Sequence, residues 1–343
     1  MLNRAVVLHG VGDLRVDDVP VPQPGAGEVL VEVRAVGVCG SDVHYYEHGR
    51  IGARVVRQPL ILGHEAAGVV RGQGPGATRH PVGQRVALEP GVPCGGCRQC
   101  RGGRYNLCPE VRFFGTPPVD GAFSNYVTIH QDFAFPLPDR LSDDAGAMIE
   151  PLSVGVWACR KANLQGGEHV LVTGAGPVGL LAMQAALALG ATQVTITDVN
   201  PHRLDLAGRT GATRTVDLRE RPLGEAGVEA DVLLECSGHP AALADGIRSL
   251  RPAGVAVVVG MSPGEEAAIP LAFLQSRELT LTGTFRYANT YPTAIELVAG
   301  GRVDVEAIVT GHFSLDEAER ALQAGRQDPR SVKAVVVPDA TGH

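Results

Sequence analysis

Four cysteines lie within one short stretch of this chain, at positions 94, 97, 100 and 108. The stretch also contains Gly95, Gly96, Gly102 and Gly103, and glycines allow a loop to fold closely around an ion. Four thiolates at such spacing are typical of a closed tetrahedral zinc site, in which no position remains for a substrate. Cys94, Cys97, Cys100 and Cys108 are therefore predicted to bind a structural zinc ion, with an iron–sulfur cluster as the alternative.

A second set of residues with ligand chemistry is spread along the first half of the chain: Cys39, His64, Glu65 and Glu150. Sulfur, nitrogen and oxygen ligands of this kind suit a catalytic zinc ion with one open position. Their spacing alone does not assemble them into a site, because a lone cysteine is commonly a small buried residue and a lone glutamate commonly lies on the surface.

A glycine-rich turn is the third feature with chemical meaning. Residues 174–179 read Gly-Ala-Gly-Pro-Val-Gly, directly after a predicted strand at 169–173 and at the start of a predicted helix. The next predicted strand ends at Asp198. In this setting Gly174 allows a tight turn, Gly176 admits the pyrophosphate of a dinucleotide, and Gly179 allows close packing of helix and strand. With Pro177 and Val178 they begin a helix whose free N–H groups attract phosphates.

Asp198 bears on which dinucleotide is bound. A carboxylate at the end of this strand accepts hydrogen bonds from the ribose hydroxyls and repels a 2′-phosphate, so NAD is predicted rather than NADP. Arg203, five residues later, is expected near the adenine or in solvent.

The elements that must position these residues fall into two kinds. Residues up to about 150 read as short β-branched runs separated by glycine and proline, which predicts a mainly β domain. From residue 169 strands alternate with helices, which predicts a doubly wound parallel sheet and an α/β fold. Asn200 and Pro201 are typical of a helix start. Ser314 and Glu317 have the spacing of a capping box.

Composition excludes several classes of protein. A net charge of −7 and an aromatic content of 4% argue against a nucleic-acid-binding protein. Residues 170–197 carry no charge, but their glycines favour strand, turn, helix and strand over a membrane span. The first ten residues lack the long apolar core of a secretory signal. Seven cysteines without such a signal indicate a reducing compartment, so a cytoplasmic location is expected.

Taken in order, several segments resemble the zinc-dependent medium-chain dehydrogenases, most closely the sorbitol (polyol) branch, over essentially the whole chain. They are CGSDVHYYEHGRIG from Cys39, LGHEAAGVV, the four-cysteine loop, RFFGTPP, IEPLSVGV, TGAGPVG with Asp198, ECSG and TFRYANTYP. The resemblance implies a GroES-like catalytic domain of residues 1–154 and 287–343, with a zinc lobe at about 91–110. Residues 155–286 would form the Rossmann domain, and the C-terminal tail would pack back on the N-terminal domain.

The same resemblance implies roles for individual residues. Cys39, His64 and either Glu65 or Glu150 would bind a catalytic zinc ion, and Ser41 and His44 would carry the alcohol proton away. Ser41, Tyr45, Phe114, Thr116, Glu150, Arg286 and Tyr287 would line the substrate pocket. Val259, Gly260, Thr284, Phe285, Arg286 and Arg203 would join the glycine-rich turn in binding NAD. Each subunit would hold two zinc ions, and the assembly would be a homotetramer.

These features together predict an NAD-dependent zinc enzyme that oxidises a secondary hydroxyl of a polyol such as sorbitol or xylitol. An L-threonine 3-dehydrogenase is the alternative within the same architecture. A catalytically silent dinucleotide-binding relative is disfavoured, because Cys39, His64, Glu65 and Glu150 are all present.

Overall fold

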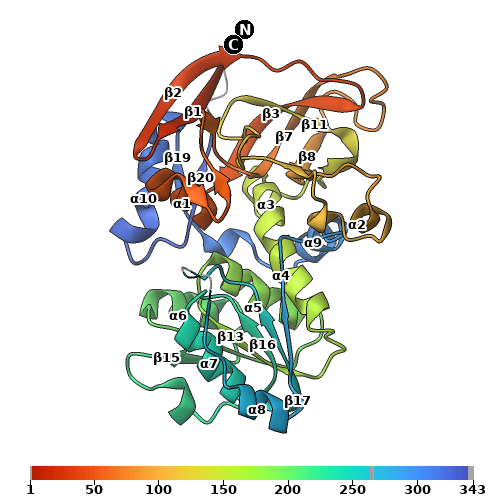
Figure 1. The fold of residues 1–343 in the computed structure, drawn as a ribbon. Helices are drawn as coiled ribbons and strands as arrows, with labels where there is room; N and C mark the ends of the chain where they lie inside the picture. The colour runs from red at the N-terminus through yellow and green to blue at the C-terminus, as the bar shows by residue number, and fades with distance from the viewer. Residues whose placement is uncertain (1, 263, 265, 339–343) are drawn as a thin grey trace. The chain divides into compact units, whose positions relative to one another are not determined.

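The computed structural model describes residues 2–262, 264 and 266–338, and Figure 1 shows their arrangement as a ribbon. The chain divides into two compact units. Unit 1 comprises residues 1–150 and 309–343, and unit 2 comprises residues 151–308. The α/β fold class is confirmed, since one unit is mainly β and the other is built on a parallel sheet.

Unit 1 is organised around a seven-stranded sheet. β3 lies near its middle and pairs with β7, β11 and β20. Its valines Val29, Val31 and Val33 alternate along the strand and are almost fully buried, as expected for a strand with one face on the core. The strands are β12 (Ala134–Pro136), β8 (Arg85–Leu88), β7 (Glu65–Gln73), β3 (Glu28–Gly37), β20 (Lys333–Val336), β19 (Val309–Phe313) and β11 (Tyr126–His130).

Smaller elements complete unit 1. A three-stranded sheet contains β2 (Asp13–Pro20), β1 (Leu2–Gly10) and β6 (Leu60–Ile61), and two strand pairs are β9 (Gly91–Val92) with β10 (Arg112–Phe113) and β4 (Arg50–Ile51) with β5 (Arg54–Val55). The helices are α1 (Gly40–His48), α2 (Arg98–Arg101), α3 (Asp143–Ala147) and α10 (Ala318–Gln327), with short 3₁₀ turns η1 (Tyr105–Leu107), η2 (Gln131–Phe133) and η5 (Leu315–Glu317).

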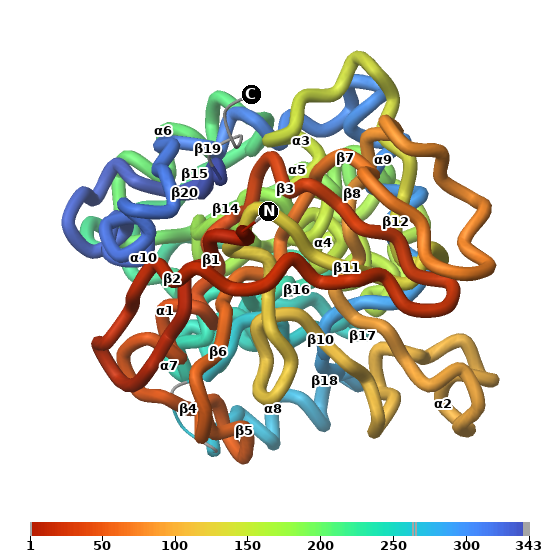
Figure 2. The backbone as a smooth tube through the Cα atoms, turned by 90° about the horizontal axis from the view of Figure 1, so that it is seen from above, coloured from red at the N-terminus to blue at the C-terminus, as the bar shows by residue number. Residues whose placement is uncertain are grey.

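The C-terminal tail joins the sheet of unit 1, as the resemblance implied. β20 pairs antiparallel with β3 and parallel with β19, and Figure 2 shows α10, β19 and β20 grouped together. The predicted capping box forms, because the Ser314 backbone N–H donates to Glu317 Oε2 at 3.2 Å just before α10. Both ends of the chain therefore contribute strands to one sheet.

Unit 2 contains a six-stranded parallel sheet in the order β15-β14-β13-β16-β17-β18. The order runs outward in both directions from β13 and β16, which is the doubly wound topology predicted from the sequence. The strands are β13 (His169–Thr173), β14 (Gln193–Asp198), β15 (Arg214–Asp217), β16 (Ala230–Glu235), β17 (Leu250–Val258) and β18 (Thr280–Gly283). The helices are α5 (Pro177–Ala188), α6 (Pro201–Arg209), α7 (Pro240–Arg248), α8 (Leu271–Ser276) and α9 (Tyr291–Ala299), with 3₁₀ turns η3 (Leu223–Glu225) and η4 (Glu306–Ile308). Helix α4 (Ile149–Lys161) begins at the end of unit 1 and continues into unit 2.

The uncharged stretch 170–197 is explained by this sheet. It forms β13, the helix α5 and β14, and nearly every residue of α5 is buried. Among the described residues no helix has the length and apolarity to cross a membrane. The predicted start of the next helix is also confirmed, since Asn200 Oδ1 accepts from the His202 N–H at 3.0 Å and Pro201 is the first residue of α6.

The structure places residues 287–308 in a different unit from the one that the resemblance implied. The structure groups them with unit 2, not with the catalytic domain. Arg160 donates to the Asn289 carbonyl oxygen at 2.7 Å and to Thr293 Oγ1 at 2.8 Å. Gln184 exchanges two hydrogen bonds with the backbone of Asp304. These contacts attach α9 and the following turn to α4 and α5.

Candidate active site and zinc-binding loop

Three of the four predicted catalytic ligands come together in unit 1. One ligand atom each from Cys39, His64 and Glu65 lies within 4.8 Å of the others. Cys39 is the cap residue before α1, and Glu65 is the first residue of β7. A thiol, an imidazole and a carboxylate at this separation fit a zinc ion with an open position. Among the described residues this close group does not include Glu150, which is buried in the first turn of α4.

Asp42 holds this arrangement together, although the sequence analysis did not name it. Its Oδ2 accepts from the Cys39 N–H at 2.9 Å, and its Oδ1 accepts from the Gly63 N–H at 3.0 Å. Oδ1 also lies 3.6 Å from His64 Nδ1. A buried carboxylate that contacts a metal-binding histidine orients its imidazole ring. The negative charge also stabilises positive charge on the ring or on a metal ion bound to it. The sequence does contain a pattern that indicates this role. Asp42 is the third residue of the helix that follows Cys39, which is the position of the acidic residue in a capping box.

The electrostatics of the site favour a cation. Burial acts to lower the pKa of His64, but the Asp42 carboxylate and the Cys39 sulfur outweigh it and raise that pKa well above its usual value. Glu89, which directly follows β8, has a pKa raised to about 7 by burial, and its Oε1 accepts from the Tyr105 hydroxyl at 2.7 Å. Several acidic groups are therefore enclosed in one region of unit 1.

Helix α1 carries the residues assigned to proton transfer. Ser41, His44 and Tyr45 are spaced three and four residues apart, so they share one face of the helix. His44 Nδ1 is buried and has no hydrogen-bond partner among the described residues, and the His44 ring lies edge-on to His48 with centroids 4.7 Å apart.

The aromatic residue beside the ligands is Phe113, which the sequence analysis did not name. Its ring centroid lies 5.5 Å from that of His64. Phe114, the predicted pocket residue, belongs to the buried core of unit 1, and Thr116 is buried in the turn that follows. Adjacent residues in an extended segment point to opposite sides. Phe113 therefore lies beside His64, whereas Phe114 packs in the core, although the two are neighbours in sequence.

The four-cysteine loop forms as predicted, with one sulfur from each cysteine within 4.8 Å of the others. Cys97 Sγ and Cys100 Sγ are 3.4 Å apart, and Gly95 and Gly103 take left-handed conformations with φ of +71°. The Cys100 backbone N–H donates to Cys97 Sγ and lowers the pKa of Cys97 to about 7, which favours the thiolate that a metal requires. Among the described cysteines none forms a disulfide.

The glycine-rich turn of unit 2 has the geometry that a dinucleotide requires. Gly174 has φ of +88°, and a Cβ at Gly179 would lie 1.9 Å from the Gly174 carbonyl oxygen. A Cβ at Gly176 would meet nothing within 4 Å, so that position is open to a ligand at the start of α5. Pro177 and Val178 are the first residues of that helix.

A pocket of about 550 Å³ lies beside this turn, at the carboxyl ends of the parallel strands. Doubly wound sheets bind their ligands at this end. Four predicted cofactor residues line it: Gly174, Gly176, Asp198 and Arg203. Of the other predicted contacts, Val259 and Gly260 follow β17 and donate to the Glu235 carbonyl oxygen at 2.8 Å each, and Thr284 follows β18.

Glu235 fixes the wall of this pocket and was missed from the sequence. It is buried at the end of β16, and its Oε1 accepts from the Ser237 N–H at 2.8 Å and the Gly238 N–H at 3.0 Å. Ser237 in turn lies against Gly174, whose Cβ would come within 2.9 Å of the Ser237 backbone.

Phe285 is half exposed, and the Arg286 guanidinium lies 4.9 Å from its ring centroid. Tyr287 is buried, with its ring 5.8 Å from that of Tyr291.

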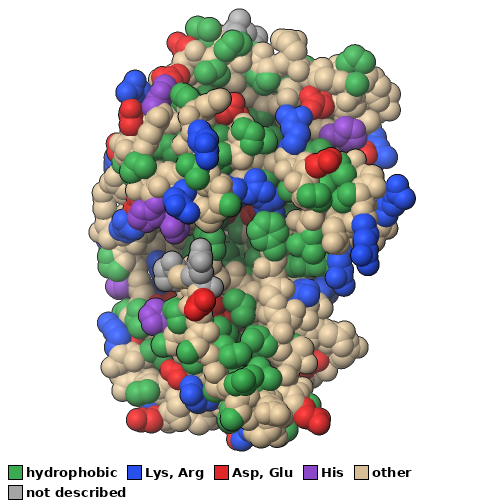
Figure 3. Space-filling view, viewed as in Figure 1, with side chains coloured by type: hydrophobic (Ala, Val, Ile, Leu, Met, Phe, Trp, Pro, Cys, Tyr) green, Lys and Arg blue, Asp and Glu red, His purple; other side chains and the backbone are tan. Residues whose placement is uncertain are grey.

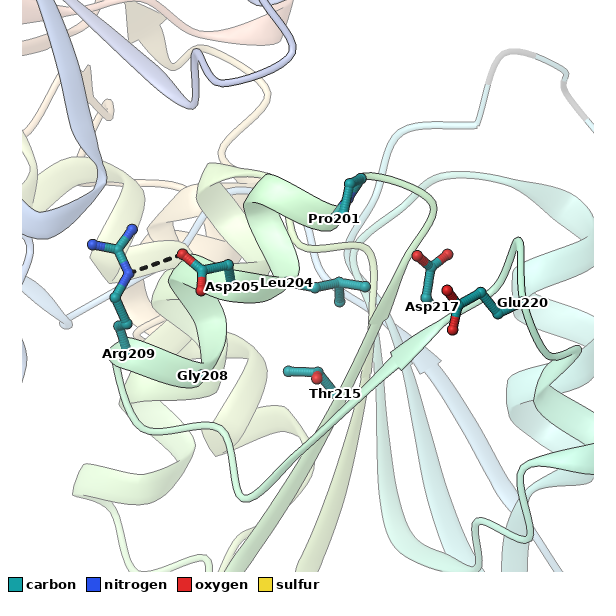
Figure 4. A pocket seen from close by; sticks show the side chains of 8 residues that line it. All are labelled: Pro201, Leu204, Asp205, Gly208, Arg209, Thr215, Asp217 and Glu220. Atoms are coloured by element: carbon teal, nitrogen blue, oxygen red, sulfur yellow. Dashed lines mark ion pairs between the residues drawn. The ribbon is translucent and has the colours of Figure 1, made fainter.

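A separate surface hollow between α6 and β15 is drawn in Figure 4. Two of its carboxylates are paired: Asp205 bonds Arg209 at 3.1 Å on the same helix, as the dashed line in Figure 4 marks, and Asp217 bonds Arg219 at 2.6 Å. Exposed pairs of this kind are ordinary surface features, so no functional role is assigned to the hollow.

Replacing Asp198 by asparagine is expected to reduce the preference for NAD⁺ over NADP⁺ by roughly tenfold or more, because the negative charge opposing a 2′-phosphate is removed. Asp198 also accepts from the Ala175 N–H at 2.6 Å and the Asn200 N–H at 2.8 Å. Asparagine keeps an acceptor there, which alanine would not. The ratio of kcat/KM for the two cofactors measures the effect, and Asp205→Asn is the control. A wild-type preference for NADP⁺ would contradict this assignment.

Comparison with known proteins supports these assignments of fold and chemistry. The family described as "Alcohol dehydrogenase GroES-like domain" matches residues 25–139, and the family "Zinc-binding dehydrogenase" matches residues 177–300. The chain is 44% identical to sorbitol dehydrogenase of Bacillus subtilis, over 98% of this chain and 97% of that protein.

Solved structures give the same result. An oxidoreductase/dehydrogenase of unknown specificity from Escherichia coli superposes with a TM-score of 0.95 at 34% identity, over 99% of this chain and 100% of that one. A zinc-binding dehydrogenase from Sinorhizobium meliloti, bound to NADP, superposes with a TM-score of 0.91 at 32% identity, over 98% and 100%. The chain belongs to the zinc-dependent medium-chain dehydrogenases, and within that family to the sorbitol dehydrogenase branch.

Proposed function

We propose that the protein is an NAD-dependent zinc enzyme that oxidises a secondary hydroxyl of a sorbitol- or xylitol-type polyol to the ketose. The observation that carries this proposal is the close group of Cys39, His64 and Glu65 in a fold whose second unit has a dinucleotide pocket. The similarity to a sorbitol dehydrogenase over nearly the whole chain supports the substrate class.

The residues of unit 1 have distinct parts in this reaction. Cys39, His64 and Glu65 would hold the zinc ion, which as a Lewis acid lowers the pKa of an alcohol. Glu65 is favoured as the third ligand, because the close group contains Glu65 and not Glu150. Asp42 keeps the His64 ring in place through Oδ1. The buried carboxylate of Glu150 is assigned to a hydroxyl of the substrate.

Proton and hydride leave the substrate by different routes. Oxidation of the alcohol breaks one O–H and one C–H bond: Ser41 and His44 would carry the proton away, and NAD⁺, when bound, would supply the acceptor for the hydride. The unpaired Nδ1 of His44 supports this role, because histidine exchanges protons near neutral pH. In unit 2 the glycine-rich turn would hold the pyrophosphate and Asp198 the ribose.

The function is tested by a panel of kcat/KM values with NAD⁺ for sorbitol, xylitol, L-arabinitol, L-threonine and ethanol. We expect the polyols to be preferred by about tenfold or more. L-threonine as the best substrate would favour the alternative, an L-threonine 3-dehydrogenase, for which the curated relative reported above gives no support.

Arg286→Ala is expected to lower kcat/KM for sorbitol by about ten- to a hundred-fold, because a charge-assisted hydrogen bond is worth roughly 1.5–3 kcal/mol. A simple secondary alcohol such as 2-butanol has no further hydroxyls to lose, so its kcat/KM should change much less. Arg286 has φ of +53°, and Arg286→Lys is the control that keeps the charge at the same backbone position. Equal losses on both alcohols would make Arg286 a structural or cofactor-binding residue.

The assembly and location are also proposals. A homotetramer is supported by the unpaired edge of β18, where Leu281 is 37% exposed, and by exposed Leu271 on α8. A cytoplasmic location is supported by the free cysteines. A small-molecule partner and not a nucleic acid is supported by the face in Figure 3, where basic and acidic side chains are interspersed. Light scattering on the purified protein tests the tetramer.

A further inference from the structure

Lys333 is an unusual residue in this molecule. It is one of only two lysines in the chain, and on β20 it is 2% exposed. Its Nζ donates to Glu65 Oε1 at 2.7 Å and to the Val38 carbonyl oxygen at 2.8 Å. Glu65 Oε2 also lies 2.5 Å from Nζ, but it is outside hydrogen-bond geometry. A buried ammonium group is costly unless it is paired, and its pair here is a candidate zinc ligand.

Three neighbouring strands are shaped to hold this pair. Gly37 on β3 stands opposite Glu65 on β7 and Val335 on β20. A Cβ at Gly37 would lie 2.0 Å from Glu65 Oε2 and 3.0 Å from Lys333 Cε. The absence of a side chain at Gly37 therefore provides the space that the carboxylate and the ammonium group occupy.

The charges around Lys333 are negative. Its Nζ lies within 2.7 Å of both carboxylate oxygens of Glu65. The ammonium group thus faces the carboxylate of a candidate zinc ligand. Without metal, this ion pair between Lys333 and Glu65 links β20 to β7.

We propose that Lys333 is a positioning residue: it is the counter-ion that holds the Glu65 carboxylate in place when the catalytic site is free of metal. Both Glu65 oxygens lie against Lys333 Nζ, with Oε1 accepting a hydrogen bond at 2.7 Å and Oε2 lying 2.5 Å away, so a zinc ion bound to either oxygen would share the carboxylate with the ammonium group. In the zinc-loaded protein, the zinc ion and Lys333 would both compensate the negative charge of Glu65. The proposal rests on the proposed function to the extent that Glu65 is a ligand of the catalytic zinc.

A thermodynamic consequence distinguishes this role from ordinary packing. In Lys333→Met the metal-free protein has a buried carboxylate without a counter-ion, whereas in the zinc-loaded protein the metal compensates that carboxylate. Zinc should therefore raise the melting temperature of the variant more than that of the wild type. A side chain that only filled space would lower both melting temperatures equally.

The experiment measures melting temperature before and after removal of the more weakly held zinc by chelation, with the zinc content determined in each sample. In Lys333→Met we expect the zinc-dependent shift to exceed that of the wild type by about 6 °C or more. Lys161→Met, which changes the other lysine, is the matched control and should shift like the wild type. Equal losses in the two metal states, or no loss, would overturn the proposal.

A double variant keeps the test decisive if Lys333→Met fails to fold without metal. Glu65→Gln with Lys333→Met removes both charges, so its metal-free form should melt higher than that of Lys333→Met alone. If the double variant is equally unstable, Lys333 acts through packing and the proposal is wrong. If the wild type holds zinc only in the cysteine loop, the proposed function fails instead, while the comparison of the metal-free variants still tests the Lys333–Glu65 pair.

Discussion

His64→Ala is expected to abolish alcohol oxidation while leaving NAD binding intact. His64 supplies the nitrogen of the Cys39–His64–Glu65 group, and alanine has no ligand atom. Loss of Lewis-acid assistance removes several kcal/mol of transition-state stabilisation, so kcat should fall on the order of 10³-fold or more. Steady-state kinetics measure the loss, and titration with NAD⁺ measures cofactor affinity, which depends on unit 2.

His312→Ala is the matched control for this change. His312 also faces a carboxylate, with Nε2 2.6 Å from Asp144 Oδ2, but it lies on the surface of unit 1. We expect full activity from that variant. If His64→Ala retained turnover and zinc content, the three residues would not be the catalytic ligands, and the proposed reaction would lose its main support.

Cys100→Ser is expected to have the largest effect on stability. The variant loses one of four sulfur ligands, and the loop of residues 94–108 depends on the metal because its glycines and short helix α2 provide little packing. We expect the zinc content to fall by one ion and the stability of unit 1 to fall by roughly 3 kcal/mol or more, which lowers its melting temperature by about 6–12 °C.

Arg98→Ser, at an exposed position of the same helix, controls for the substitution itself. Elemental analysis and calorimetry on both variants separate ligand loss from a local packing effect. Unchanged zinc content and melting temperature in Cys100→Ser would show that the loop does not bind a structural ion.

The features that the sequence predicted correctly depend on neighbours along the chain. The cysteines of the loop lie within fifteen residues, and the turn from Gly174 to Gly179 is defined by the strand before it and the helix after it. The spacing of apolar residues along a short segment indicates whether that segment forms a helix or a strand. The parallel sheet of unit 2 followed from the same kind of pattern.

The features that were missed depend on residues far apart in sequence. Lys333 and Glu65 are 268 positions apart, and the pairing of β3 with both β20 and β7 brings them together. Phe113 was not named from the sequence, because residue type alone does not show which aromatic side chain lies beside His64. The segment 287–308 was assigned by resemblance, whereas the hydrogen bonds of Arg160 and Gln184 place it with unit 2.

Unit 1 is built from two separate segments, residues 1–150 and 309–343, and this has a consequence for its synthesis on the ribosome. At 5–20 residues per second, a ribosome needs about 10–50 s to proceed from Glu65 to Lys333. During that time unit 2, which is continuous in sequence, can fold, while the edge of β3 and the Glu65 carboxylate wait for β20. Folding of unit 1 is therefore completed late, when β20 has been synthesised, and in a nascent chain stopped before residue 333 the Glu65 carboxylate lacks its partner Lys333.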